Sequence, residues 1–140
     1  MPKFVVHEHH ARHLHFDFRL EMEGVLKSWA VPRGPSMNPS DKRLAVMVED
    51  HSLEYGSFEG TIPEGLYGAG TVAIWDEGTY RMLGGDIHSG KLEFFMDGKK
   101  LKGVFVLTKM KAKDKEWLLI KKKDEHADPA FRLKTVEFGR

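Results

Sequence analysis

The sequence predicts an all-β fold of antiparallel strands, and three observations lead to this prediction. Short apolar or alternating stretches recur along the chain, at lengths typical of strands. Clusters of Gly, Pro, Asp and Asn separate them at regular intervals, as turns do. No heptad or internal repeat is present. With 140 residues the chain is expected to form one domain over residues 1–140. Pattern alone leaves both a barrel and a sandwich open.

The clearest strand is residues 15–20, in which polar and apolar side chains alternate strictly. His15, Asp17 and Arg19 should therefore share one face, and the apolar residues should share the other. A surface strand usually carries replaceable Lys, Glu, Thr or Ser on its solvent-exposed side. Here that side would carry two candidate metal ligands and an arginine suited to phosphate. Three upstream histidines have the same parity, so one long, unbulged strand would turn them the same way: His7, His9 and His13.

The other elements follow from the same patterns. Pro32 closes the strand after residues 15–20, and a loop over 33–42 follows it. Asp76-Glu77-Gly78 should end a later strand, and Asp97-Gly98 marks a hairpin turn over 97–100. Only residues 124–131 indicate a short helix. The further strands are expected over residues 25–31, 43–48, 71–75, 91–96, 101–109 and 116–123.

The composition is that of a soluble globular protein, with 41% hydrophobic and 31% charged residues. No apolar run is long enough for a membrane span or a secretory signal, so we expect a cytoplasmic protein without a membrane partner. The absence of Cys excludes disulfides, a thiolate nucleophile and a zinc–thiolate site. Net charge is +1, but the C-terminal third is rich in lysine. These lysines could follow a nucleic-acid backbone or simply form a solvated face: Lys99, Lys100, Lys102, Lys109, Lys111, Lys113, Lys115, Lys121, Lys122 and Lys123.

Two imidazoles and one carboxylate, from His9, His15 and Asp17, could bind a divalent metal ion and leave coordination positions open for substrate. Without sulfur ligands, Mn²⁺ or Zn²⁺ would suit the site, and a phosphate substrate favours Mn²⁺. Histidines often satisfy structural hydrogen bonds instead. Spacing does not exclude three competing ligands, His7, His10 and His13.

Three further residues could handle a phosphate group. Arg19 lies about 6–7 Å beyond Asp17 along the same strand face, where it could grip phosphate oxygens or merely neutralise Asp17. His51 ends the segment that follows residues 43–48 and could donate to a phosphate oxygen or protonate a leaving group. Tyr55 could add a hydroxyl donor. Alternatively, His51 is a turn residue and Tyr55 a half-buried one.

Other phosphate and hydrolase motifs are absent from the sequence. Residues 63–70 are rich in glycine but lack the Gly-Lys-Ser/Thr ending of a nucleotide-binding loop, so a tight loop before a strand is the better interpretation. No Gly-x-Ser-x-Gly elbow or protein-kinase motif is present, which leaves an acyl-transfer triad or a kinase without support.

Several motifs, in this order, closely resemble the 3′-phosphoesterase domain of bacterial DNA ligase D. The resemblance is close over about residues 4–75 and looser towards the C-terminus. The motifs are H-x-A-x-x-L-H-F-D-F-R-L from His9, L-K-S-W-A-V-P from Leu26, R-L-A-V from Arg43, E-D-H ending at His51, F-E-G from Phe58 and I-P-E-G-x-Y-G-A-G from Ile62.

The resemblance implies a compact β-barrel with an active site in a concave surface. It implies a Mn²⁺-dependent enzyme that heals 3′ ends at DNA breaks, trimming a terminal ribonucleotide and removing a 3′-phosphate; Zn²⁺ or Co²⁺ are other candidate metals. By motif position, the metal ligands would be His9, His15 and Asp17. The residues expected to contact phosphate or support those contacts are Arg19, His51, Tyr55, Arg33 and Arg43.

In ligase D this domain is joined to ligase and polymerase modules, so the chain resembles a free-standing form of it. The expected partners are primer-template DNA ends that carry a 3′-ribonucleotide or 3′-phosphate, with a separate ligase or repair polymerase. Two alternatives stay open: a non-catalytic metal-binding scaffold for nucleic acid, and a small-barrel phosphatase that acts on free nucleotides.

Overall fold

The computed structural model describes residues 1–136, which form nine strands and one short 3₁₀ helix, η1 (Leu53–Ser57). The expected all-β fold is therefore confirmed. Residues 137–140 of the expected domain lie outside the described part. The strands are β1 (Lys3–His10), β2 (Leu14–Met22), β3 (Val25–Val31), β4 (Lys42–His51), β5 (Gly60–Ile62), β6 (Gly70–Asp86), β7 (Lys91–Gly98), β8 (Lys102–Lys109) and β9 (Glu116–Lys121).

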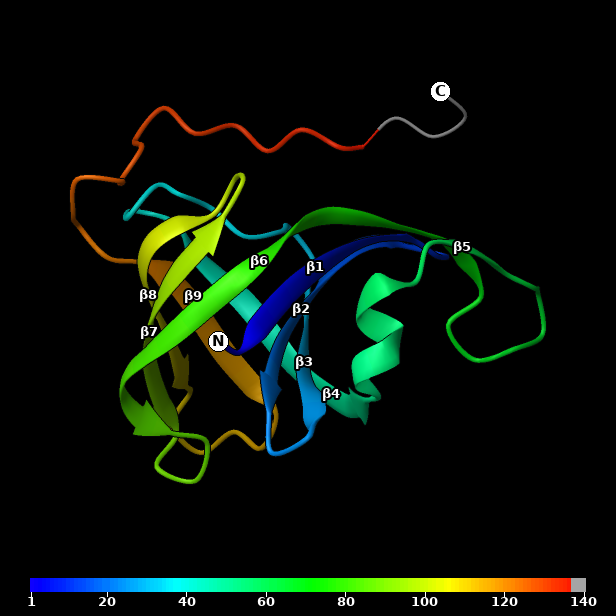
Figure 1. Cartoon of the computed structure of the whole chain (residues 1–140), viewed down its shortest axis with the longest axis horizontal. Coiled ribbons are helices and arrows are strands. Elements are labelled where there is room, and N and C mark those ends of the chain that lie inside the picture. The colour runs from blue at the N-terminus through cyan, green and yellow to red at the C-terminus, as the bar shows by residue number, and fades with distance from the viewer. Residues whose placement is uncertain (137–140) are drawn as a thin grey trace.

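The strands form a closed antiparallel barrel (Figure 1). Their order is β1-β2-β3-β4-β9-β8-β7-β6, and the pairing of β6 with β1 closes the circle. The short strand β5 pairs with the start of β6. Closure removes the free sheet edges that a sandwich would leave, so the structure decides for the barrel. None of the described helical segments is long and apolar enough to cross a membrane.

Large apolar side chains fill the interior of the barrel. On β2 these are Phe16, Phe18 and Leu20, each at most 2% exposed. Trp117 of β9 meets Trp29 of β3 edge to face, with ring centroids 5.7 Å apart. Because side chains alternate along a strand, the residues between these apolar ones must project from the outer wall.

Strand limits differ from the expectations in two places. Residues 7–20 are not one long strand; β1 and β2 form a hairpin, with His13 in the connecting segment. Strand β6 continues through Asp76-Glu77-Gly78, where the sequence predicted its end. Gly78 makes this continuation feasible, because a Cβ atom there would overlap the Asp97 carbonyl oxygen of β7.

The expected helix over residues 124–131 is wrong. Asp124 instead accepts hydrogen bonds from the backbone N–H groups of Val104 and His126, and the following residues continue as turns and extended chain. The segment 124–136 runs beside the barrel (Figure 1, orange to red). It is held by Trp75, whose indole N–H donates to the Lys134 carbonyl at 2.7 Å, and by the buried Glu8, which accepts from the backbone of Val136 at 2.6 Å.

Candidate metal and phosphate site

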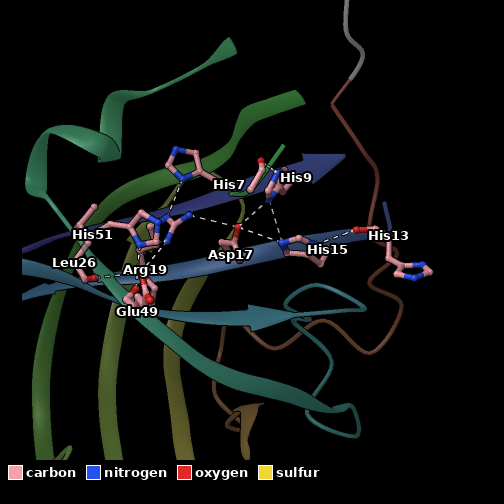
Figure 2. A network of polar contacts seen from close by, with 11 residues as sticks. His7, His9, His13, His15, Asp17, Arg19, Leu26, Glu49 and His51 are labelled. Carbon is pink, nitrogen blue, oxygen red and sulfur yellow. Dashed lines mark hydrogen bonds and ion pairs between the residues drawn. The ribbon is translucent and has the colours of Figure 1, made fainter. Parts of the chain in front are cut away.

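The polar residues of β1 and β2 lie side by side on the outer wall of the barrel. In the hairpin register His9 is opposite His15, and His7 is opposite Asp17. An open cavity of about 320 Å³ lies against this part of the wall. The site residues are drawn close together in Figure 2. The cavity is lined by His9, Ala11, His15, Asp17, Arg19, Ala30, Val48, His51, Tyr55, Ile62, Tyr67 and Gly68.

The structure brings His9, His15 and Asp17 into one cluster of candidate metal ligands. His9 Nδ1 lies 3.2 Å from His15 Nε2. Asp17 Oδ2 lies 3.5 Å from His9 Nδ1 and 3.3 Å from His15 Nε2. Ligand atoms bound to one divalent ion at about 2.1 Å are about 3.0 Å apart in an octahedron and about 3.4 Å apart in a tetrahedron. The three measured edges fall close to these values, so the residues fit a divalent ion.

Backbone carbonyl groups fix the tautomer of both histidines. His9 Nε2 lies 2.8 Å from the Gly68 carbonyl oxygen, and His15 Nδ1 lies 3.0 Å from the carbonyl oxygen of His13. A carbonyl oxygen can only accept, so each of these ring nitrogens must donate. The inner nitrogens, His9 Nδ1 and His15 Nε2, then face each other with lone pairs and need a cation between them. Outer hydrogen bonds of this kind are typical of metal-binding histidines.

Asp17 supplies the negative charge of the cluster. Burial alone would raise its pKa, but hydrogen bonds with His15 and His9 and the nearby Arg19 outweigh burial and hold the pKa well below its usual value. The hydrogen bond with Asp17 raises the pKa of His15 in turn. At neutral pH the carboxylate is ionised, and a proton on His15 can take the place that a metal ion would occupy.

Arg19 is fixed in place beside this cluster and is only 2% exposed. Its Nε donates to His7 Nδ1 at 3.0 Å, and its Nη1 donates to Ser28 Oγ at 2.9 Å. Nη2 lies 3.4 Å from Asp17 Oδ2. The guanidinium also lies 5.0 Å from the centre of the Tyr55 ring. Nε and Nη1 are engaged in short hydrogen bonds, whereas Nη2 has only the longer contact with Asp17, so Nη2 is the nitrogen best able to donate to a ligand in the cavity.

A β-bulge turns His51 towards the site. Ser28 of β3 pairs with Val48 of β4, whereas Leu26, two residues earlier, pairs with His51, three residues later. The extra residue lies in the Glu49–Asp50 stretch of β4. Without it, strict alternation would put His51 on the inward face that carries Met47. Bulges beside functional sites commonly redirect a side chain in this way.

His51 Nδ1 has two neighbours that require different tautomers. It lies 3.1 Å from Arg19 Nη1, which can only donate, and 3.0 Å from the Glu49 carbonyl oxygen, which can only accept. With Arg19 as its partner, His51 carries its proton on Nε2 and is a donor there. Burial and the charge of Arg19 lower the pKa of His51, which favours a neutral ring.

Tyr55 lies in η1 and packs over the other site residues. Its ring centroid is 4.8 Å from that of His51, 5.3 Å from that of His7 and 5.2 Å from that of Phe58. Burial raises the pKa of its hydroxyl, so the group remains a donor at neutral pH. The Tyr55 ring therefore packs against the Arg19 guanidinium, and Tyr55 also lines the cavity.

The remaining sequence candidates lie elsewhere. Neither Arg33 nor Arg43 lines the cavity; Arg33 is exposed in the turn after β3, and Arg43 has the inward parity of Ala45 on β4 and lies 3.5 Å from Asp41. His10 contacts the buried Glu8, and the His13 ring points away from the cluster (Figure 2).

The lysine-rich third of the chain does not border the cavity. Its strands, β7 to β9, lie across the barrel from the β1–β2 hairpin. Lys121 is buried, and its ammonium donates to Asp124 and to the carbonyl of Lys122. Lys100 donates to the Trp75 carbonyl and lies over the Trp75 ring. At these two positions the lysines serve the fold.

Three site groups were missed or misread from sequence. The parity of His7 placed it on the correct face, but as a competing metal ligand; instead it accepts from Arg19. Ser28 shares the outward face of β3 with Ala30, which alternation could have indicated, although a lone Ser in a strand rarely attracts notice. The contribution of Gly68 is a backbone carbonyl, which no side-chain pattern encodes.

Comparisons with known proteins agree on one family. A family model described as the DNA Ligase D 3′-phosphoesterase domain matches residues 7–109. The chain is 49% identical over 140 residues to the multifunctional non-homologous end joining protein LigD of Pseudomonas aeruginosa, covering 96% of this chain. It is 45% identical over 132 residues to LigD of Mycobacterium tuberculosis, covering 93% of this chain, and 42% identical over 132 residues to that of Mycolicibacterium smegmatis, covering 88%.

The chain spans only 17% of the length of each of these relatives. The family match nonetheless covers most of the chain and begins at His7, so it includes the entire ligand cluster and Arg19. The protein therefore belongs to the DNA ligase D 3′-phosphoesterase domain family.

Proposed function

We propose that this protein is a divalent-metal-dependent phosphoesterase that heals 3′ ends of broken nucleic acid. It would remove a 3′-terminal ribonucleotide as a phosphodiesterase and a 3′-phosphate as a phosphomonoesterase. One observation supports this above all: a three-ligand metal cluster, a buried arginine and a histidine converge on one open cavity. The residues 1–140 would act as one domain, in the cytoplasm, where the genome is accessible.

Each residue has a role in this proposal. His9, His15 and Asp17 would hold the ion, which would act as a Lewis acid on the phosphate when bound. Arg19, already oriented by His7 and Ser28, would donate from Nη2 to a non-bridging oxygen. His51 would donate from Nε2 to another oxygen in the tautomer that accepts from Arg19. Donors fixed before the reaction stabilise developing charge without a cost of reorganisation.

We propose Mn²⁺ as the metal, because the ligands are nitrogen and oxygen atoms and the substrate is rich in oxygen. Zn²⁺ and Co²⁺ would fit the same donors. The ends of primer-template DNA would be the substrate, and a ligase or polymerase would use the healed 3′-hydroxyl. Contacts of Arg33 and Arg43 with substrate stay predictions, and they would require a substrate that extends beyond the cavity.

The test compares four substrates with purified protein: an oligonucleotide with a 3′-phosphate, one with a single 3′-ribonucleotide, an all-deoxy 3′-hydroxyl strand and a nucleoside 3′-monophosphate. Each is incubated with EDTA, Mn²⁺, Zn²⁺ or Co²⁺, and Asp17→Asn is the control. We expect Mn²⁺-dependent turnover of the first two substrates. Equal turnover of the mononucleotide would favour a phosphatase of free nucleotides, and metal binding with no turnover would favour a scaffold.

A further inference from the structure

Tyr67 is a solvent-exposed aromatic residue at the edge of the cavity. It is 82% exposed, yet it is among the residues that line the cavity. Its neighbour Leu66 is also exposed but does not line the cavity. Tyrosine is enriched at interfaces, because its ring offers an apolar face and its hydroxyl a polar end.

The loop that carries Tyr67 is hydrogen-bonded to His9, one of the three candidate metal ligands. The next residue, Gly68, accepts the hydrogen bond from His9 Nε2 at 2.8 Å. Two turns shape the loop, with backbone bonds from Leu66 to the Pro63 carbonyl and from Ala69 to the Leu66 carbonyl. Gly68 has a φ of +78°, a conformation in which other residues are strained. The position of Tyr67 is therefore coupled to that of a metal ligand.

The two tyrosines of the cavity differ in what their rings contact. Tyr55 packs against His7, His51 and Phe58. Within residues 1–136 the ring of Tyr67 has no aromatic or cationic partner. Tyr67 still acts electrostatically on Arg19: burial lowers the pKa of Arg19, and Asp17, Tyr55 and Tyr67 oppose that effect. Tyr67 therefore lies within electrostatic reach of Arg19 and lines the same cavity, and most of its surface is open to solvent.

We infer that the Tyr67 ring is the stacking platform for the base of the 3′-terminal nucleotide. This inference rests on the proposed function, because it requires a nucleotide whose phosphate lies at Arg19. Every base offers a flat π-face, so stacking would hold the end nucleotide without selecting its sequence, as a repair enzyme for arbitrary breaks requires. The metal cluster and Arg19 recognise only phosphate, so Tyr67 would provide the preference for a nucleotide over a simple phosphate ester.

The kinetic test uses two oligonucleotides of one sequence, both with a 3′-phosphate, whose terminal nucleotide either carries its base or is abasic. We expect the wild-type protein to prefer the base-bearing end by about tenfold in KM, which corresponds to about 1.4 kcal/mol. Tyr67→Ala should lose this preference with little change in kcat, and Tyr67→Phe should keep it. Leu66→Ala is the matched control in the same loop and should behave like wild type.

A binding measurement separates this inference from the proposed reaction. An oligonucleotide with 2-aminopurine as its terminal base and a 3′-phosphate is titrated with protein in EDTA, and stacking on Tyr67 should quench its fluorescence. Tyr67→Ala should not quench it. Turnover with an unchanged base preference and unchanged quenching in Tyr67→Ala would overturn the inference alone. Quenching that depends on Tyr67, without turnover of any 3′-phosphate, would instead overturn the proposed reaction.

Discussion

Arg19 donates from Nε to Nδ1 of His7 at 3.0 Å, in a contact buried beneath Tyr55. The bond fixes the plane of the guanidinium and so the direction of its free donors. His7→Ala should lower kcat about tenfold with little change in KM, because Arg19 would keep its charge but lose its orientation. His7→Gln offers a side-chain oxygen as acceptor and should recover most of the rate. Steady-state kinetics on a 3′-phosphate substrate checks this, and equal losses in both variants would contradict it.

The same histidine predicts a pH dependence of stability. Burial, together with the nearby Arg19, lowers the pKa of His7 from 6.5 to about 4. Between these values the unfolded chain binds a proton that the folded chain does not, so the free energy of unfolding falls as pH falls from 6.5 to 4. His7 accounts for up to about 3 kcal/mol of this fall. Urea denaturation in EDTA should show a flatter profile for His7→Gln than for wild type, and parallel profiles would contradict the assignment.

Arginine at position 19 should not be replaceable by lysine. Arg19→Lys keeps the positive charge but cannot donate at once to His7, Ser28 and a phosphate oxygen. We expect kcat/KM to fall at least tenfold, more than about 1.4 kcal/mol of transition-state stabilisation. Thermal unfolding of the variant serves as the control for folding. Near-normal kcat/KM would show that charge alone is sufficient.

Metal binding can be tested without any substrate. Asp17→Asn keeps the shape of the side chain but removes its charge, and we expect Mn²⁺ affinity by calorimetry to fall more than about 100-fold, beyond the usual effect of losing an outer-sphere partner. Asp50→Asn is the matched control, because Asp50 is paired with Lys27 at 2.9 Å outside the cluster. Equal affinities in wild type and Asp17→Asn would remove Asp17 from the ligand set.

An ion pair with a fully buried lysine predicts a stability effect far from the cavity. Lys121, with a fully buried side chain, donates to Asp124 at 2.6 Å. Asp124→Ala would leave that ammonium without its carboxylate and should lower the free energy of unfolding by about 3 kcal/mol. Adding Lys121→Met should recover part of this loss, since the ammonium lies over the Phe105 ring in apolar surroundings. Chemical denaturation measures both, and a double variant less stable than the single one would refute the explanation.

Much of the site was predictable because alternation along a strand is a local property. The spacing of His15, Asp17 and Arg19 fixes their common face whatever the rest of the chain does. The all-β class followed from the strand and turn patterns, and the family resemblance predicted a barrel instead of a sandwich. The joining of His9 to this face was predicted by parity, although the structure achieves it by a hairpin rather than a single strand.

The parts that could not be predicted depend on distant residues. His51 reaches the site only through the bulge in β4, which breaks the parity on which such predictions rest. The helix expected over residues 124–131 failed because Asp124 binds the backbone of Val104 and the ammonium of Lys121, contacts that local propensity does not contain. The Gly68 carbonyl reaches His9 because of the conformation of a loop that is distant in sequence, which no side-chain pattern indicates.

Adjacent residues of β2 belong to different parts of the molecule, the core and the outer cavity. Phe16 and Phe18 pack in the core of the barrel, whereas their sequence neighbours Asp17 and Arg19 line the cavity on its outer wall. An engineer could therefore raise heat tolerance and reshape substrate choice within the same short stretch of gene, provided that no residue is inserted or deleted there. Inserting or deleting one residue in β2 would turn the core residues outward and the cavity residues inward, and both the core packing and the cavity would be lost.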